Sequence, residues 1–269
     1  MKDVHFSNPP LVELVLGLQC DELELFTIPH VGLLWQRFRE QFPRTEVQHP
    51  LDPSFERFGH ERLEARRPSI QLVQTPPFPR IWFLNLAGTE LIQIQQDRFI
   101  HNWRKQEGDE YPHYDIVRER FRNELDLFGT FLADEGLGKV VPNQCEITYV
   151  NHILPGKLWQ HHDEYDRVVN IGLGEALTSA GALEALRFRT TYLIRNSSNA
   201  TIGRLYVSFQ PGFSRTGGTP IFKLTLSARG APEAASMESV FQFLDTAHAL
   251  IVERFVSLTT RRAHEEWGI

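Results

Sequence analysis

RIWFLNLAGTELIQIQQDRFIHNWR, residues 80–104, decides the fold because apolar and polar side chains alternate along three successive runs. A Gly-Thr pair at 88–89 and a polar corner at 95–97 separate the runs, so the stretch predicts an antiparallel meander. The preceding SIQLVQT, residues 69–75, also alternates and predicts a further strand. Such a sheet needs helices or a second sheet to cover its apolar face.

The flanking segments supply those helices. Residues 11–19 alternate as a strand, and residues 28–42 carry apolar side chains at helical spacing. The stretch after residue 42 is polar and predicts irregular structure. Residues 113–135 predict a long helix, whose apolar stripe includes Val117, Phe121 and Phe128.

The second part of the chain repeats this order. Residues 143–154 predict a strand, 184–196, 200–210 and 219–230 a second meander, and 236–260 a closing helix. We therefore expect an α+β protein with two pseudo-repeats, 1–140 and 141–269, each of strand, connecting helix, antiparallel meander and long helix. Joined edge to edge in one compact unit, they would form a curved antiparallel sheet with helices on one face, as in the TATA-binding protein. A helix-grip fold is the alternative.

Composition limits the classes of function. The chain has 269 residues, a formal net charge of −6 and two cysteines, Cys20 and Cys145. The negative charge disfavours a protein that coats nucleic acid, and two cysteines are too few for a disulfide scaffold. We expect both thiols to be small buried side chains. No apolar run is long enough for a signal or membrane segment, which predicts a cytoplasmic protein without membrane contact.

The helix-free face of the predicted sheet is the candidate binding surface. Period-two alternation puts polar side chains of both meanders on this face. Arginine forks and amides suit phosphate, carboxylate or a polynucleotide, whereas the structural alternative is a solvated sheet face. The candidate ligand-binding residues are Gln95, Arg98, Asn102, Arg104, Arg187, Arg189, Arg204, Lys223, Glu13 and His152.

Metal and catalytic patterns are weak. His161, His162 and Asp163 form the nearest thing to a metal cluster, but adjacent histidines on a helix point about 100° apart. His248, on the apolar stripe of the last helix, predicts a hydrogen-bonded core residue. Glu13 and Glu146 hold matching strand positions and predict either a carboxylate pair or two ion pairs with sheet arginines. We therefore assign no metal, cofactor or catalytic residue.

Several motifs span nearly the whole chain. They are Asn8-Pro9-Pro10-Leu11-Val12-Glu13, Asn102-Trp103-Arg104 with Tyr111-Pro112, Tyr149-Val150-Asn151-His152, Asp245 with Ala247-His248, and His264-Glu265-Glu266-Trp267-Gly268. Together they resemble a sporadically distributed bacterial protein family of no established activity. The resemblance implies an accessory protein and suggests a role in mobile-element or phage conflict.

The leading hypothesis is a non-catalytic binding or interaction protein, because the sequence contains no catalytic constellation. Its helix-free face or a homodimer interface would meet a small anionic ligand or a protein partner. One alternative is a metal-assisted enzyme acting on a phosphate-containing substrate through the His161 region. Another is nucleic-acid binding, which the net charge disfavours.

Overall fold

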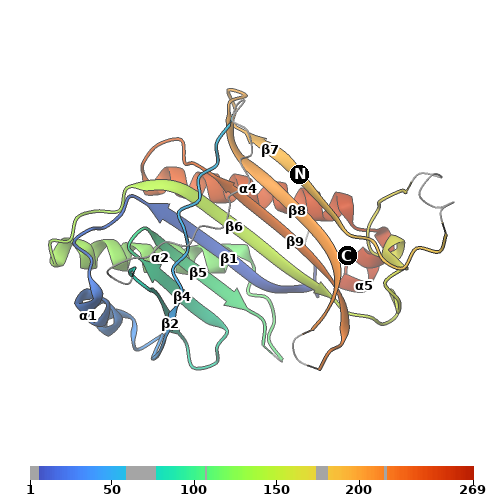
Figure 1. Ribbon diagram of the computed structural model, residues 1–269, viewed down its shortest axis with the longest axis horizontal. Helices are drawn as coiled ribbons and strands as arrows, with labels where there is room; N and C mark the ends of the chain where they lie inside the picture. The colour runs from blue at the N-terminus through green and yellow to red at the C-terminus, as the bar shows by residue number, and fades with distance from the viewer. Residues whose placement is uncertain (1–5, 59–76, 107, 174–180, 215–216) are drawn as a thin grey trace.

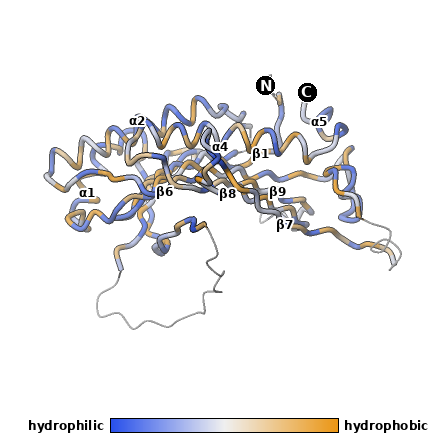
Figure 2. Tube along the Cα trace, turned by 90° about the horizontal axis from the view of Figure 1, so that it is seen from above, coloured by the Kyte–Doolittle hydropathy of each residue, from blue (hydrophilic) through white to orange (hydrophobic). Residues whose placement is uncertain are grey.

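A computed structural model describes residues 6–58, 77–106, 108–173, 181–214 and 217–269. Within these residues the chain is an α+β protein built on a single nine-stranded antiparallel sheet. The helices lie on one face of that sheet (Figures 1 and 2). The predicted class and the one-sided placement of the helices are therefore confirmed.

The two parts of the chain meet at the centre of the sheet. The strand order is β2-β3-β4-β5-β1-β6-β9-β8-β7, so β1 and β6 are neighbours and each part extends outward from its first strand. The strands are β1 (Leu11–Cys20), β2 (Arg44–Gln48), β3 (Arg80–Leu84), β4 (Glu90–Gln95), β5 (Arg98–Arg104), β6 (Pro142–Ile153), β7 (Phe188–Arg195), β8 (Thr201–Phe213) and β9 (Pro220–Gly230).

Local signals set the helix boundaries. The Ser236 hydroxyl caps the longest helix, and the Thr260 hydroxyl caps the last one. The helices are α1 (Ile28–Phe38), α2 (Tyr114–Asp134), α4 (Met237–Leu258) and α5 (Arg261–Trp267), with a short 3₁₀ turn η1 (Tyr165–Arg167). No helix in the described ranges combines the length and the apolarity that a membrane crossing requires.

The core lies between the sheet and the helices. The rings of Phe99 on β5 and Phe128 on α2 are 5.2 Å apart, and those of Phe121 on α2 and Phe241 on α4 are 6.0 Å apart. These residues and Phe255 belong to one buried cluster, as the helical stripes predict. Both cysteines are buried and unpaired, and burial raises the pKa of each thiol to about 12.

Two details depart from the sequence prediction, and a third cannot be compared with it. Residues 44–48 form the edge strand β2, and its side chains are mostly exposed, which leaves no apolar alternation to detect. The helix predicted over 28–42 ends at Phe38, although the N–H of Phe42 still donates to the Phe38 carbonyl and keeps the Phe42 ring in the core. The strand predicted over 69–75 lies outside the described residues.

Candidate functional site

The helix-free face of the sheet carries the polar side chains that alternation predicts. Cross-strand pairing sets Gln95 beside Arg98, Glu13 beside Arg104 and His152 beside Lys223. Their neighbours along each strand point to the helices and fill the core. The structure thus brings most of the predicted residues to one face, but it also puts another segment over them.

That segment, residues 49–58, is called the strap here. It leaves β2 and crosses the helix-free face toward the second meander (Figure 1), on the opposite side from the helices (Figure 2). Three glutamines from different strands hold its backbone. Gln95 on β4 accepts from the Leu51 N–H at 2.9 Å and donates to its carbonyl at 3.0 Å, while Gln19 on β1 accepts from the Ser54 N–H at 2.9 Å.

The third glutamine, Gln144 on β6, accepts from the Glu56 N–H at 3.3 Å. The Glu56 carboxylate then reaches β8, where it pairs with Arg204 and accepts from the Tyr206 hydroxyl at 2.8 and 3.0 Å. Arg204 also donates to the Arg57 carbonyl at 2.7 Å. The Glu56 side chain is only 8% exposed, so Arg204 already binds a buried anion of its own chain.

Arg98 has a similar internal role. Its guanidinium donates to both carboxylate oxygens of Asp97 at 3.0 Å and to the Asp52 carbonyl of the strap at 3.0 Å. The side chain is 10% exposed. Arg98 and Gln95 therefore lie on the predicted face, but both use their polar groups to hold the strap.

The two strand glutamates form ion pairs with arginines. Glu13 accepts from Asn102 and from Arg104, both at 2.8 Å. Glu146 accepts from Arg229 at 2.8 Å. Across the β1–β6 pair, Glu13 faces Val150 and Glu146 faces Gly17, so the two carboxylates are not opposite each other. Of the two predicted arrangements, the structure has the ion pairs.

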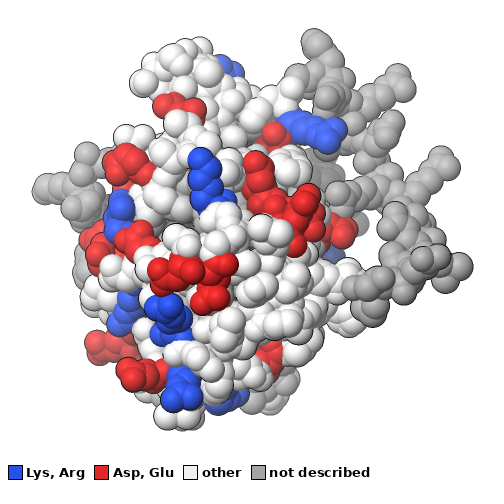
Figure 3. All heavy atoms as spheres, turned by 90° about the vertical axis from the view of Figure 1, so that its left-hand side faces the viewer, with Lys and Arg blue, Asp and Glu red and all other residues white. Residues whose placement is uncertain are grey.

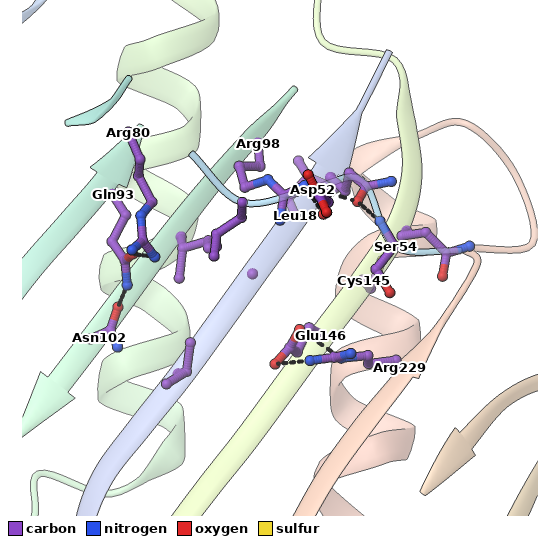
Figure 4. Close-up of a pocket in the computed structure, with 16 residues that line it drawn as sticks. Leu18, Asp52, Ser54, Arg80, Gln93, Arg98, Asn102, Cys145, Glu146 and Arg229 are labelled. Carbon is purple, nitrogen blue, oxygen red and sulfur yellow. Dashed lines mark hydrogen bonds and ion pairs between the residues drawn. The ribbon is translucent and has the colours of Figure 1, made fainter. Parts of the chain in front are cut away.

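A cavity of about 350 Å³ lies between the strap and the sheet. Arg80, Gln93 and Asn102 line one side of it, and the Glu146–Arg229 pair lines the other (Figure 4). Asp52 and Ser54 of the strap lie at one end of this group of side chains. Gly17 of the central strand contributes no side chain to the floor, which leaves room between the two polar groups.

Arg80 is the most unusual group in this cavity. It donates from Nη1 to the side-chain oxygen Oε1 of Gln93 at 2.8 Å, and its guanidinium lies over the Trp82 ring at 5.5 Å. Its Nε is buried without a hydrogen-bond partner, and no carboxylate of the described chain pairs with it. Burial lowers the pKa of Arg80, and the positive charge of Arg98 lowers it further.

The remaining predicted residues lie away from the cavity. Burial lowers the pKa of His152, and the charge of Lys223 opposite it adds to the effect. Arg189 on β7 lies over the Tyr206 ring at 5.4 Å, and Arg187 is exposed just before that strand. The structure therefore spreads the predicted cations over the face and does not gather them in one cluster.

The histidine-rich segment is a turn packed on the second meander. His162 bonds to the Ile221 carbonyl at 3.1 Å and stacks on Trp159. The backbone N–H groups of Gln160 and His161 donate to the Glu164 carboxylate. Across the described ranges, no three His, Cys, Asp or Glu side chains are placed to hold a metal ion.

On the helix side, several motif residues meet between α2, α4 and β6. The Tyr149 hydroxyl lies 2.7 Å from His248 Nδ1, which confirms the predicted hydrogen-bonded histidine. The Tyr114 ring stacks on His248 at 3.9 Å, and its hydroxyl donates to Asp245 at 2.7 Å. Arg118 donates to both oxygens of Asp245. These motif residues join the two long helices to the sheet.

Sequence reasoning missed the strap, Arg80 and Arg229 as parts of the site. The available signal was the set of glutamines on the helix-free face of three separate strands, since buried glutamines need partners. Alternation along residues 98–104 predicts that Trp103 faces the helices, opposite to Asn102, and the structure confirms this: Trp103 is buried, with its ring 5.2 Å from that of Tyr111. It stabilises the corner between β5 and α2.

Comparison with known proteins gives no relative from which a function could be transferred. No protein-family model matches the chain, and no curated protein or solved structure shows significant similarity to it. The case for function therefore depends on the geometry of the site.

Proposed function

We propose that the chain is a non-catalytic binding protein whose cavity beneath the strap holds a small anionic ligand. The observation that carries this proposal is the state of Arg80, a partly buried cation in the cavity that has no carboxylate partner in the described chain. Guanidinium groups bind carboxylates and phosphates through paired N–H donors. An anion beside Arg80 would supply the acceptor that its buried Nε lacks.

The other arginines around the cavity favour a small ligand over a polynucleotide. Arg98 is neutralised by Asp97, Arg104 by Glu13, and Arg229 by Glu146. A polyanion needs a continuous series of unpaired cations. At the end of the molecule where α1 lies, Figure 3 shows acidic and basic side chains intermixed, so that end also has no extended patch of one sign.

The test is a thermal melt of purified protein in the presence of inorganic phosphate, pyrophosphate, citrate and AMP. We expect at least one of these anions to raise the melting temperature saturably, because a ligand of the folded state stabilises it. Arg80→Gln should abolish that shift. Arg44→Gln is the matched control, since Arg44 lies on the sheet edge with half of its side chain exposed. The proposal fails if no anion acts up to millimolar concentration or if Arg80→Gln responds like the wild type.

We also infer that the two parts of the chain are pseudo-repeats in the arrangement of the TATA-binding protein. The strand order supports this, because each part has its first strand at the centre, its last meander strand beside it and a long helix after the meander. The pairs Glu13–Arg104 and Glu146–Arg229 add support, since each joins the first strand of its part to the last meander strand. The alternative, a helix-grip fold, agrees less well with the structure, because that fold wraps its sheet around a single helix and this chain has two long ones.

A further inference from the structure

We propose that the surface beneath the strap is a docking site for an extended acidic segment of a partner protein. This segment would replace the strap and place a glutamate carboxylate against Arg204 and Tyr206. This inference goes beyond the small-anion site. It concerns the strap contacts on β4, β1, β6 and β8, whereas the anion site is centred on Arg80.

The contacts beneath the strap are directed mainly to a backbone. Gln95, Gln19 and Gln144 bond to main-chain groups of Leu51, Ser54 and Glu56. Arg98 and Arg204 donate to the main-chain carbonyls of the strap as well. Because main-chain groups are common to all sequences, another extended chain can make the same bonds. The sheet therefore offers a peptide-binding track that the chain fills with its own segment.

Glu56 supplies the sequence-specific contact. Its carboxylate accepts from Arg204 and from the Tyr206 hydroxyl, and its side chain is almost fully buried. Charge-assisted bonds of this kind are stronger and more selective than neutral ones. A competing segment therefore needs an acidic side chain at the equivalent position, and a neutral or basic side chain would leave the partly buried Arg204 without a counter-ion.

The strap is attached in a way that permits exchange. Apart from the Glu56 side chain, residues 49–58 are partly or largely exposed, and Phe55 is 50% exposed, so the strap contributes little apolar contact. The side chains beneath it, by contrast, are buried polar groups, including Gln19 at 7% and Gln144 at 8% exposure. Segments with few buried apolar contacts open at low free-energy cost. Once uncovered, the polar groups are ready to bind a replacement chain.

The test measures binding of a fluorescently labelled synthetic peptide, QHPLDPSFERF, which has the sequence of residues 48–58. In the wild-type protein the tethered strap competes at an effective concentration in the millimolar range, so the peptide should bind weakly. The full-length Glu56→Gln variant has lost the anchoring carboxylate and should bind the peptide at least about tenfold more tightly by fluorescence anisotropy. A peptide with glutamine in place of glutamate should lose that gain.

Asp134→Asn is the control protein, because Asp134 pairs with Arg37 away from the strap and its loss should leave peptide affinity unchanged. Glu56→Asp keeps the charge on a shorter side chain and should bind with intermediate affinity, which provides a second variant if Glu56→Gln does not fold. The proposal is wrong if folded Glu56→Gln or Glu56→Asp binds no more tightly than wild type, or if the glutamine peptide binds equally well. Arg80→Gln should retain peptide binding, so this test and the anion test fail separately.

Discussion

The close contact between α4 and the second meander gives the sharpest test of the fold. Gly203 and Gly230 are opposite each other on β8 and β9, and the Phe243 ring of α4 lies against the pair. A Cβ added at Gly230 would lie 2.5 Å from Phe243 Cε2 and 2.8 Å from the Gly203 Cα, and it would also overlap the Ile202 carbonyl oxygen. The carbonyl and the Cα belong to the backbone of β8, which is paired on both sides, so they cannot rotate away.

We therefore expect Gly230→Ala to destabilise the protein. Overpacking of a filled core costs about 1–3 kcal/mol, and contact with fixed backbone atoms places this substitution toward the upper end. Alanine loses less chain entropy than glycine on folding, which returns about 0.5–1 kcal/mol. The net loss in the free energy of unfolding should be about 2 kcal/mol.

The assay is urea unfolding followed by circular dichroism and tryptophan fluorescence, with ΔG taken from the midpoint and slope. Gly212→Ala is the matched control on the same strand pair, because the nearest atom to its added Cβ is Ile221 Cγ1 at an ordinary 3.8 Å. It should change stability by no more than about 0.5 kcal/mol. If Gly230→Ala is as stable as Gly212→Ala, the close packing of α4 on this glycine pair is refuted.

Three further predictions concern Trp103 at the corner between β5 and α2, the two halves of the chain, and the ion pair between Arg118 and Asp245. Trp103→Ala should lower the free energy of unfolding in urea by about 3–5 kcal/mol, because Trp103 is buried. Trp82→Ala, on the helix-free face where the residue is only partly buried, should cost clearly less, and equal losses would contradict the assignment of Trp103 to the core. Residues 1–140 expressed alone should give poor amide NMR dispersion and no cooperative melt, because β1 would lose β6 and expose a central edge; a well-dispersed fragment would show two independent domains. Burial raises the pKa of Asp245, but hydrogen bonds from Arg118 and Tyr114 outweigh it and leave the folded pKa below its ordinary value. The stability that this pair adds is then complete above about pH 4 and is lost as the pH falls through the folded pKa. The difference in unfolding free energy between wild type and Asp245→Asn should therefore shrink in acid. A constant difference would show that the pair does not act through charge.

Local pattern was sufficient for most of the fold. Alternation in residues 80–104 and the apolar stripes of two long helices predicted an α+β sheet covered on one face, because these periods report directly which side chains are buried. The same reasoning placed Trp103 on the helix side and Asn102 on the other. It failed at β2, where an exposed edge strand has no buried face to create a pattern.

Pairing across the sheet and the path of the strap were decided by tertiary structure alone. The sequence pointed to an open face with Gln95, Arg98 and Arg204 available for a ligand, whereas the folded chain uses all three to hold residues 49–58. No periodicity marks that segment, because its contacts are made by backbone groups and by one carboxylate that meets partners about 150 residues away. Long-range contacts of this kind depend on strand register and chain path, which local sequence does not encode. The sequence could therefore identify the polar face. Only the folded structure shows that Arg204 has an acidic partner, whereas Arg80 lacks one within the described chain.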